Sequence, residues 1–201
     1  MSYKLIVKDV LTNLRRIGSL RSLHLTSIAK AIEQEAQETI KVIFRPVPPD
    51  KLGKFPTVLL TQQLEATGAG APNGFTIFEH FVFYPQESPD QLLKTRFSIA
   101  HELGHILMHA PYLPRYIKRR KYDKIEGTNG GLYSVAYNDE DEIRADLFAA
   151  ILCHQYPPPP KPSEFHAPCR RILAQLESDN FFSSSLPRKI SKIKACNAFQ
   201  A

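Results

Sequence analysis

Two histidines four positions apart, His101 and His105, are the residues of this sequence with the clearest capacity for chemistry. At that spacing on a helix both imidazoles lie on one face, one turn apart, and can bind the same metal ion. Glu102 lies roughly 100° around such a helix from His101, so its carboxylate can flank the ion without binding it. From there it can take a proton from the attacking water and pass it to the leaving amine. The pattern therefore predicts a zinc-dependent peptidase with Glu102 as its catalytic base.

The residues around this motif favour a buried metal site. The alternative is a solvent-exposed helix that carries two histidines and a paired Glu by chance. Apolar residues cover most of the circumference of the expected helix, so it should be deeply buried. Histidines on a buried helix need polar partners. Gly104, between the two histidines, leaves room for another segment to approach closely.

A third protein ligand is expected from a second helix, on which Glu142 and Asp146 are four residues apart and share a face. We expect Glu142 to complete a site for one zinc ion per chain. Asp146 is expected to hydrogen-bond the free nitrogen of a ligating histidine, which fixes the tautomer of that ring. The alternative is that acidic residues only complement the dipole at the start of the helix. We accept that alternative for Asp139, Glu140 and Asp141, but the carboxylate at position 146 argues against it for Glu142.

His109 extends the histidine series by one further turn. On a straight helix it lies about 6 Å further along the axis than His105, too far to share the ion, so we expect a packed or hydrogen-bonded histidine. A donor for the oxyanion of the reaction is also needed. Tyr133, Tyr137 and His154 are candidates, and the sequence does not choose among them.

The rest of the sequence predicts, in coarse outline, the framework that positions these residues. A capping box at residues 88–91 predicts the start of the helix that carries the two histidines. We expect an α+β, zincin-like fold in which a small mixed or antiparallel sheet packs on this buried active-site helix, with extra C-terminal helices. The expected helical regions are 8–38, 88–109, 139–156, 164–178 and 186–198, and the expected strands are 41–44 (ended by Pro46), 57–61 and 75–84, the last as one bent strand or a tight pair.

Length and composition suggest one sizeable core, because the chain has 201 residues of which 43% are hydrophobic. We expect a metallopeptidase domain over residues 1–156, followed over 157–201 by a proline-led linker and a small helical extension. The three cysteines have wide spacings, which argues against a disulfide framework or a cysteine zinc site. The N-terminus has no apolar segment of a signal peptide, and no apolar run is long enough to span a bilayer, so we expect a cytoplasmic protein with no membrane partner.

A formal charge of +6 raises the odds of an acidic partner. Much of the excess falls in one stretch between the two expected metal-binding helices, which could recruit a protein substrate or contact nucleic acid, or could equally be a solvated face. We also expect the strand at 75–84 to offer an edge on which an extended substrate could pair. The candidate partner-binding residues of the basic stretch are Arg115, Lys118, Arg119, Arg120 and Lys121.

The segment from Arg96 to His109, RFSIAHELGHILMH, resembles the active helix of the ImmA/IrrE zinc metallopeptidases. The segment from Glu142 to Ala150, EIRADLFAA, is similar to their second signature. The resemblance implies His101, His105 and Glu142 as zinc ligands and Glu102 as the base. It also implies substrates among helix-turn-helix transcriptional repressors. The chain departs from the family's pattern after the second helix, where Leu152-Cys153-His154 and a proline run replace the usual ending.

A different class of function is a non-catalytic, metal-containing regulatory module. Such a module would bind DNA or a regulator through the basic stretch and the C-terminal helices. A structural zinc normally has four protein ligands, whereas the sequence supplies three convincing ones and a glutamate placed as a base. The enzyme is therefore the favoured hypothesis.

Overall fold

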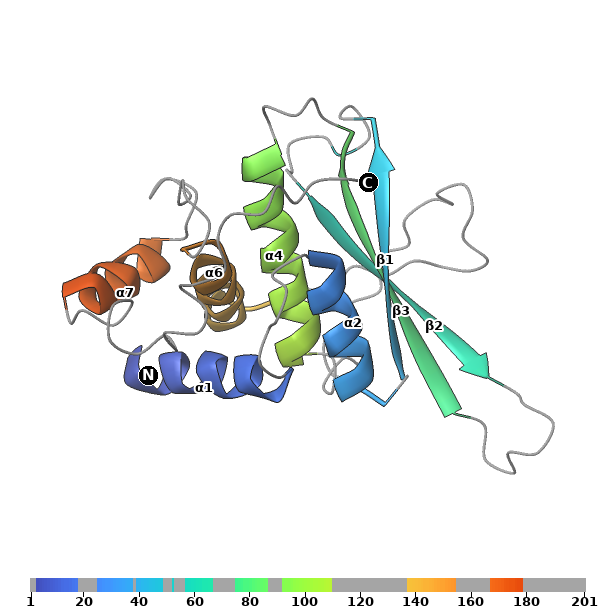
Figure 1. Cartoon of the computed structure of the whole chain (residues 1–201), viewed down its shortest axis with the longest axis horizontal. Coiled ribbons are helices and arrows are strands. Elements are labelled where there is room, and N and C mark those ends of the chain that lie inside the picture. Colours follow the sequence, from blue (N-terminus) through green and yellow to red (C-terminus); the bar gives the residue numbers. More distant parts are fainter. Residues whose placement is uncertain are drawn as a thin grey trace.

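The computed structural model describes residues 3–17, 25–37, 39–48, 52, 57–66, 75–86, 92–109, 137–154 and 167–178. These residues form an α+β fold with a small three-stranded sheet on one side and helices on the other (Figure 1). The helices are α1 (Tyr3–Arg16), α2 (Leu25–Glu35), α4 (Leu92–His109), α6 (Asp139–His154) and α7 (Ala167–Ser178), and the strands are β1 (Ile40–Val47), β2 (Val58–Ala66) and β3 (Phe75–Pro85).

The sheet is mixed, with strand order β1-β3-β2. β1 runs parallel to the central strand β3 and β2 runs antiparallel to it. β3 belongs in the middle because its two faces are both apolar: Phe81 and Phe83 pack on one side and Val82 on the other. β1 continues through Pro46, where we had expected it to end. As an outer strand it has an unpaired side on which the missing N–H of proline needs no partner.

The central position of β3 corrects the expectation that this strand offers an edge to a substrate. From Phe78 to Phe83 it is hydrogen-bonded on both sides, to β1 and to β2. The alternative of a tight pair at this position is also wrong, because residues 75–85 form one strand. The outer edges of the described sheet belong to β1 and β2.

Helix α4 lies between the sheet and α6, with α2 beside it (Figure 1). Residues on every side of α4 are buried, as the apolar pattern of the sequence predicts. α6 is almost as enclosed, because α4 covers one side of it and α1 and α7 cover others. The buried residues of α4 include Phe97, Ile99, Ala100, Leu103, Ile106 and Leu107.

The helical region expected over residues 8–38 consists of two helices, α1 and α2. α1 begins earlier than expected and crosses α6 (Figure 1), burying Ile6, Val7 and Val10. α2 buries Ile28, Ala29 and Ile32 against the same core. The N-terminal segment therefore packs directly on the helices that carry the candidate site.

Several expectations fall outside the described residues. They are the capping box at 88–91, the basic stretch that contains Arg115 to Lys121, and the last helix at 186–198. Of the C-terminal extension, the structure describes α7, whose Ile172 is buried in the same core cluster as α4 and α6. No described helix combines the length and the apolarity required to cross a bilayer.

Candidate metal centre

The candidate site is built where α4 and α6 touch, and Gly104 is the reason they can touch so closely. A Cβ atom at position 104 would lie 3.1 Å from the Cα of Ala145 and 3.1 Å from Cδ1 of Phe148. Ala145 is itself fully buried. Gly104 stands between His101 and His105 on α4, and Ala145 stands between Glu142 and Asp146 on α6. This close packing therefore sets the two imidazoles against the two carboxylates.

The donor atoms of His101, His105 and Glu142 form a small triangle. The Nε2 atoms of the two histidines are 2.9 Å apart, and Oε2 of Glu142 lies 3.2 Å from the first and 3.4 Å from the second. Three ligands of a tetrahedral zinc ion, each at about 2.0–2.1 Å, have donor atoms about 3.3 Å apart. The triangle fits that requirement. Among the described residues, this is the one group of three or more metal-ligating side chains that could hold an ion.

Asp146 determines how the ring of His101 is presented. Its Oδ1 atom lies 2.9 Å from Nδ1 of His101, and Asp146 is almost fully buried. Because the carboxylate accepts the Nδ1 proton, the Nε2 atom keeps its lone pair for the centre of the triangle. Asp146 therefore lies where the sequence placed it, behind one of the two histidines.

His105 is supported differently. Tyr137, just before α6, stacks on its ring with centroids 3.7 Å apart and planes 9° from parallel. The Nδ1 atom of His105 lies 3.4 Å from Nδ1 of His109, which is also buried. His109 is therefore a packed and hydrogen-bonded histidine, as expected. Tyr137, one of three candidates for an oxyanion donor in the sequence, contacts the His105 ring with the face of its own ring.

Asp141 has a second contact besides its expected place at the start of α6. Its side chain is only 6% exposed, and its Oδ1 lies 3.1 Å from Nε2 of His109. It also belongs to the cap of the helix, because Oδ1 of Asn138 accepts hydrogen bonds from the N–H groups of Glu140 and Asp141, and Oδ2 of Asp141 accepts one of 3.5 Å from the N–H of Asn138. Asp141 therefore faces the histidines rather than solvent.

Glu102 lies beside the triangle and not in it. Its Oε1 atom accepts a hydrogen bond of 2.9 Å from Oγ1 of Thr57, the residue before β2. Burial raises the pKa of the Glu102 carboxyl, and His101 and the Thr57 hydroxyl oppose that shift. A carboxyl whose pKa is raised toward neutrality is suited to accept and return a proton.

Comparison with protein-family models, with curated proteins and with solved structures gives no significant match to this chain. The function must therefore be argued from the site itself.

The electrostatics of the site favour a bound cation. Glu102, Glu142 and Asp146 place three carboxyl groups around the two imidazoles. Burial lowers the pKa of His101, but its hydrogen bonds to Asp146 and Glu142 outweigh burial and raise the pKa to about 10. Burial lowers the pKa of His105 to about 3. Burial raises the pKa of Glu142, but the two histidines outweigh this effect and the net shift is downward. Without a metal the cluster therefore keeps a proton on one imidazole, where a metal ion would supply the positive charge instead.

Two contacts of the site were not predicted from the sequence. Thr57 precedes Glu102 by 45 positions, and nothing in its local pattern distinguishes it from any residue at the start of a strand. Arg144 holds Asp9 of α1 at 2.9 Å and lies 3.6 Å from Asp141. An acidic partner for Arg144 could have been expected from the sequence, because a charged residue beside the apolar positions of a buried helix requires one.

Proposed function

We propose that the protein is a zinc-dependent endopeptidase, with His101, His105 and Glu142 as zinc ligands and Glu102 as the catalytic base. The observation that carries the proposal is the position of Glu102. It is partly buried beside a triangle of donor atoms whose spacing suits zinc, its Oε1 accepts a hydrogen bond from Thr57, and it does not belong to the triangle. A carboxylate in that position can handle protons without occupying a coordination site.

The three ligands would leave one tetrahedral position open, as in catalytic rather than structural zinc sites. Zinc in such a site polarises the scissile carbonyl and lowers the pKa of water. The chain's own residues supply the proton transfers: an Oε atom of Glu102 accepts a proton from the attacking water and delivers it to the leaving nitrogen. The hydroxyl of Thr57 donates to Oε1 of Glu102, and Oε2 is the oxygen proposed to take the proton.

A structural metal in a regulatory module would be expected to have a fourth protein ligand. In the described part of the chain, the group that could hold an ion contains three ligand residues. A structural site has no use for a partly buried glutamate beside the ligands, and withdrawing its carboxylate from water costs free energy. A catalytic zinc site therefore explains the position of Glu102 better than a structural zinc site does.

The finer assignments rest on the two segments that resemble the ImmA/IrrE metallopeptidases, Arg96–His109 and Glu142–Ala150. They support a zincin-like arrangement and a protein substrate, for which a helix-turn-helix transcriptional repressor is the proposed class. The basic residues from Arg115 to Lys121 are the proposed contact for such a partner or for the DNA that it binds.

The test separates metal binding from chemistry. Purified wild type is analysed for zinc by mass spectrometry and incubated with a proteome-derived peptide library, whose cleavage is read by mass spectrometry. Glu102→Gln should retain one zinc per chain and lose cleavage by at least about 10²-fold, because the amide cannot accept a proton. Glu79→Gln, the same change on β3, is the control and should behave as wild type. Cleavage by Glu102→Gln at the wild-type rate would refute the proposal, as would a wild type that binds no zinc.

A further inference from the structure

The two histidine ligands are supported in unequal ways. His101 has a carboxylate directly behind it, with Oδ1 of Asp146 2.9 Å from its Nδ1. Behind His105 lies a second imidazole, that of His109, and the carboxylate of Asp141 lies behind that. Both arrangements end on a buried aspartate of α6. The structure thus contains two carboxylate supports, one direct and one through an inserted ring.

We propose that His109 and Asp141 form a histidine relay that holds His105 in the tautomer and orientation in which its Nε2 faces the metal. The inference rests on the proposed role of His105 as a ligand. In it, His109 and Asp141 are positioning residues that act on the metal only through His105.

The direction of the hydrogen bonds follows from the chemistry of the rings. When Nε2 of His105 offers its lone pair to a metal, its proton is on Nδ1, and this N–H must donate. The Nδ1 atom of His109, 3.4 Å away, is therefore the acceptor. The proton of a neutral His109 is then on Nε2, which lies 3.1 Å from Oδ1 of Asp141, within reach of a hydrogen bond after a small rotation. Each group in the relay has one consistent role.

Stacking by Tyr137 alone does not select the orientation in which Nε2 of His105 faces the metal. Tyr137 lies nearly parallel to His105 and limits the tilt of its ring. A half-turn of the imidazole about its Cβ–Cγ bond keeps the ring in the same plane and preserves the stacking. That half-turn replaces Nε2 by a carbon atom at the centre of the site. The hydrogen bond to His109 is broken by the half-turn, so it distinguishes the two orientations.

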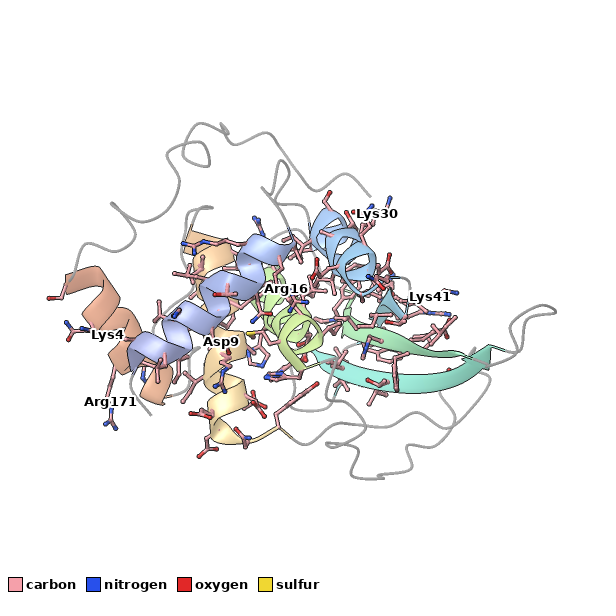
Figure 2. All side chains as sticks on the ribbon, turned by 90° about the horizontal axis from the view of Figure 1, so that it is seen from below. Lys4, Asp9, Arg16, Lys30, Lys41 and Arg171 are labelled. Atoms are coloured by element: carbon pink, nitrogen blue, oxygen red, sulfur yellow. The ribbon has the colours of Figure 1, made fainter. Side chains whose placement is uncertain are left out.

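Asp141 is itself fixed from the N-terminal helix. Arg144 lies 3.6 Å from Oδ1 of Asp141 and donates from Nε to Oδ2 of Asp9 at 2.9 Å. Figure 2 shows Asp9 on α1 where that helix packs over α6. The Nδ2 group of Asn13 donates to the other carboxylate oxygen of Asp9 at 3.3 Å. The relay therefore ends in a network that joins α1 to the metal-binding helices.

The first measurement needs no substitution. In the zinc-loaded wild type, long-range ¹H–¹⁵N NMR correlations report which ring nitrogen of each histidine carries a proton. We expect the proton on Nδ1 in His105 and on Nε2 in His109. A proton on Nδ1 of His109 would overturn the relay, because that nitrogen could then not accept from His105.

The second measurement uses two variants at one position. His109→Leu removes both hydrogen bonds and should weaken zinc binding by roughly 10 to 100-fold, measured by competition with a chelator. His109→Gln offers an amide oxygen to His105 and an amide N–H to Asp141, so it should bind zinc more tightly than His109→Leu. Circular dichroism of the metal-free proteins checks that both variants are folded to the same extent. If His109→Leu binds zinc as tightly as the wild type, or if Gln gives no recovery, the relay is wrong. A wild type without zinc affinity would instead refute the proposed function.

Discussion

The contact between α4 and α6 can be tested with one methyl group, by the substitution Gly104→Ala. The added Cβ would meet the backbone of Ala145 at 3.1 Å and the ring of Phe148 at 3.1 Å. Carbon atoms in optimal contact are about 3.5–4.0 Å apart, so α4 and α6 must move apart by a few tenths of an ångström. Overpacking of this kind costs about 1–3 kcal/mol, whereas alanine gains about 1 kcal/mol over glycine in a helix. The free energy of unfolding should therefore fall by only about 0–2 kcal/mol.

Metal binding should suffer more than stability, because the ligands are divided between the two helices. The Nε2 atoms of His101 and His105 are already 3.2 and 3.4 Å from Oε2 of Glu142. These distances already match the roughly 3.3 Å of a tetrahedral zinc site, and a few tenths of an ångström more takes both of them past it. A metal site tolerates displacements of only about 0.5 Å, so we expect zinc affinity to fall by on the order of tenfold.

The assay for Gly104→Ala combines chelator competition for zinc with urea unfolding of the metal-free protein. Phe148→Leu, which shortens the buried side chain that the methyl group meets, completes a double-mutant cycle. The double variant should recover part of the affinity lost in Gly104→Ala. Unchanged zinc affinity in Gly104→Ala, at unchanged or increased stability, would refute the argument that this glycine sets the ligand geometry.

Three further predictions concern single groups. Glu142→Ala should reduce zinc occupancy below one per chain by elemental analysis, and full occupancy would exclude Glu142 as a ligand. Asp146→Asn should weaken zinc binding by roughly 10 to 100-fold in chelator competition while the chain stays folded; loss of folding with intact affinity would make Asp146 purely structural. Burial lowers the pKa of His80 from 6.5 to about 3, so the unfolded chain binds a proton that the folded chain does not, and stability is lost as pH falls below about 6.5. Between pH 8 and pH 5 this group should reduce the free energy of unfolding by about 2 kcal/mol. His80→Gln, which keeps a partner for Thr61, should remove that part of the decrease in denaturation curves, and equal pH slopes in both proteins would contradict the prediction.

The residues brought together at the candidate metal centre could be predicted because their geometry is local. His101 and His105 share a helix face at a spacing that fixes their separation, and the same holds for Glu142 and Asp146. The role of Gly104 was also accessible, since a glycine between two ligands on an apolar helix implies a close neighbour. The sequence did not say which residue would be that neighbour; the structure identifies it as Ala145.

What could not be predicted depends on contacts between distant segments. The parallel pairing of β1 with β3 and the 135-residue separation between Asp9 and Arg144 have no local signature. The central place of β3 is a different case. Its run of Phe81, Val82 and Phe83 is apolar on successive residues, which is typical of a strand covered on both faces and argues against a substrate-binding edge. The hypothesis of an edge at this strand was wrong because closeness to α4 in the sequence does not determine which strand of the sheet is outermost.

The same contacts explain why metal and fold should depend on each other. The site buries imidazoles and carboxylates that are costly to hold without a positive charge at their centre. A ligand that binds only the folded state stabilises it by about 4 kcal/mol at a free concentration of a thousand times its Kd. α1 also shares in this stabilisation, because Asp9 reaches the site through Arg144 and Asp141. The candidate metal centre is therefore connected to α1 as well as to α4 and α6, and a bound zinc ion would supply the positive charge that the surrounding carboxylates require.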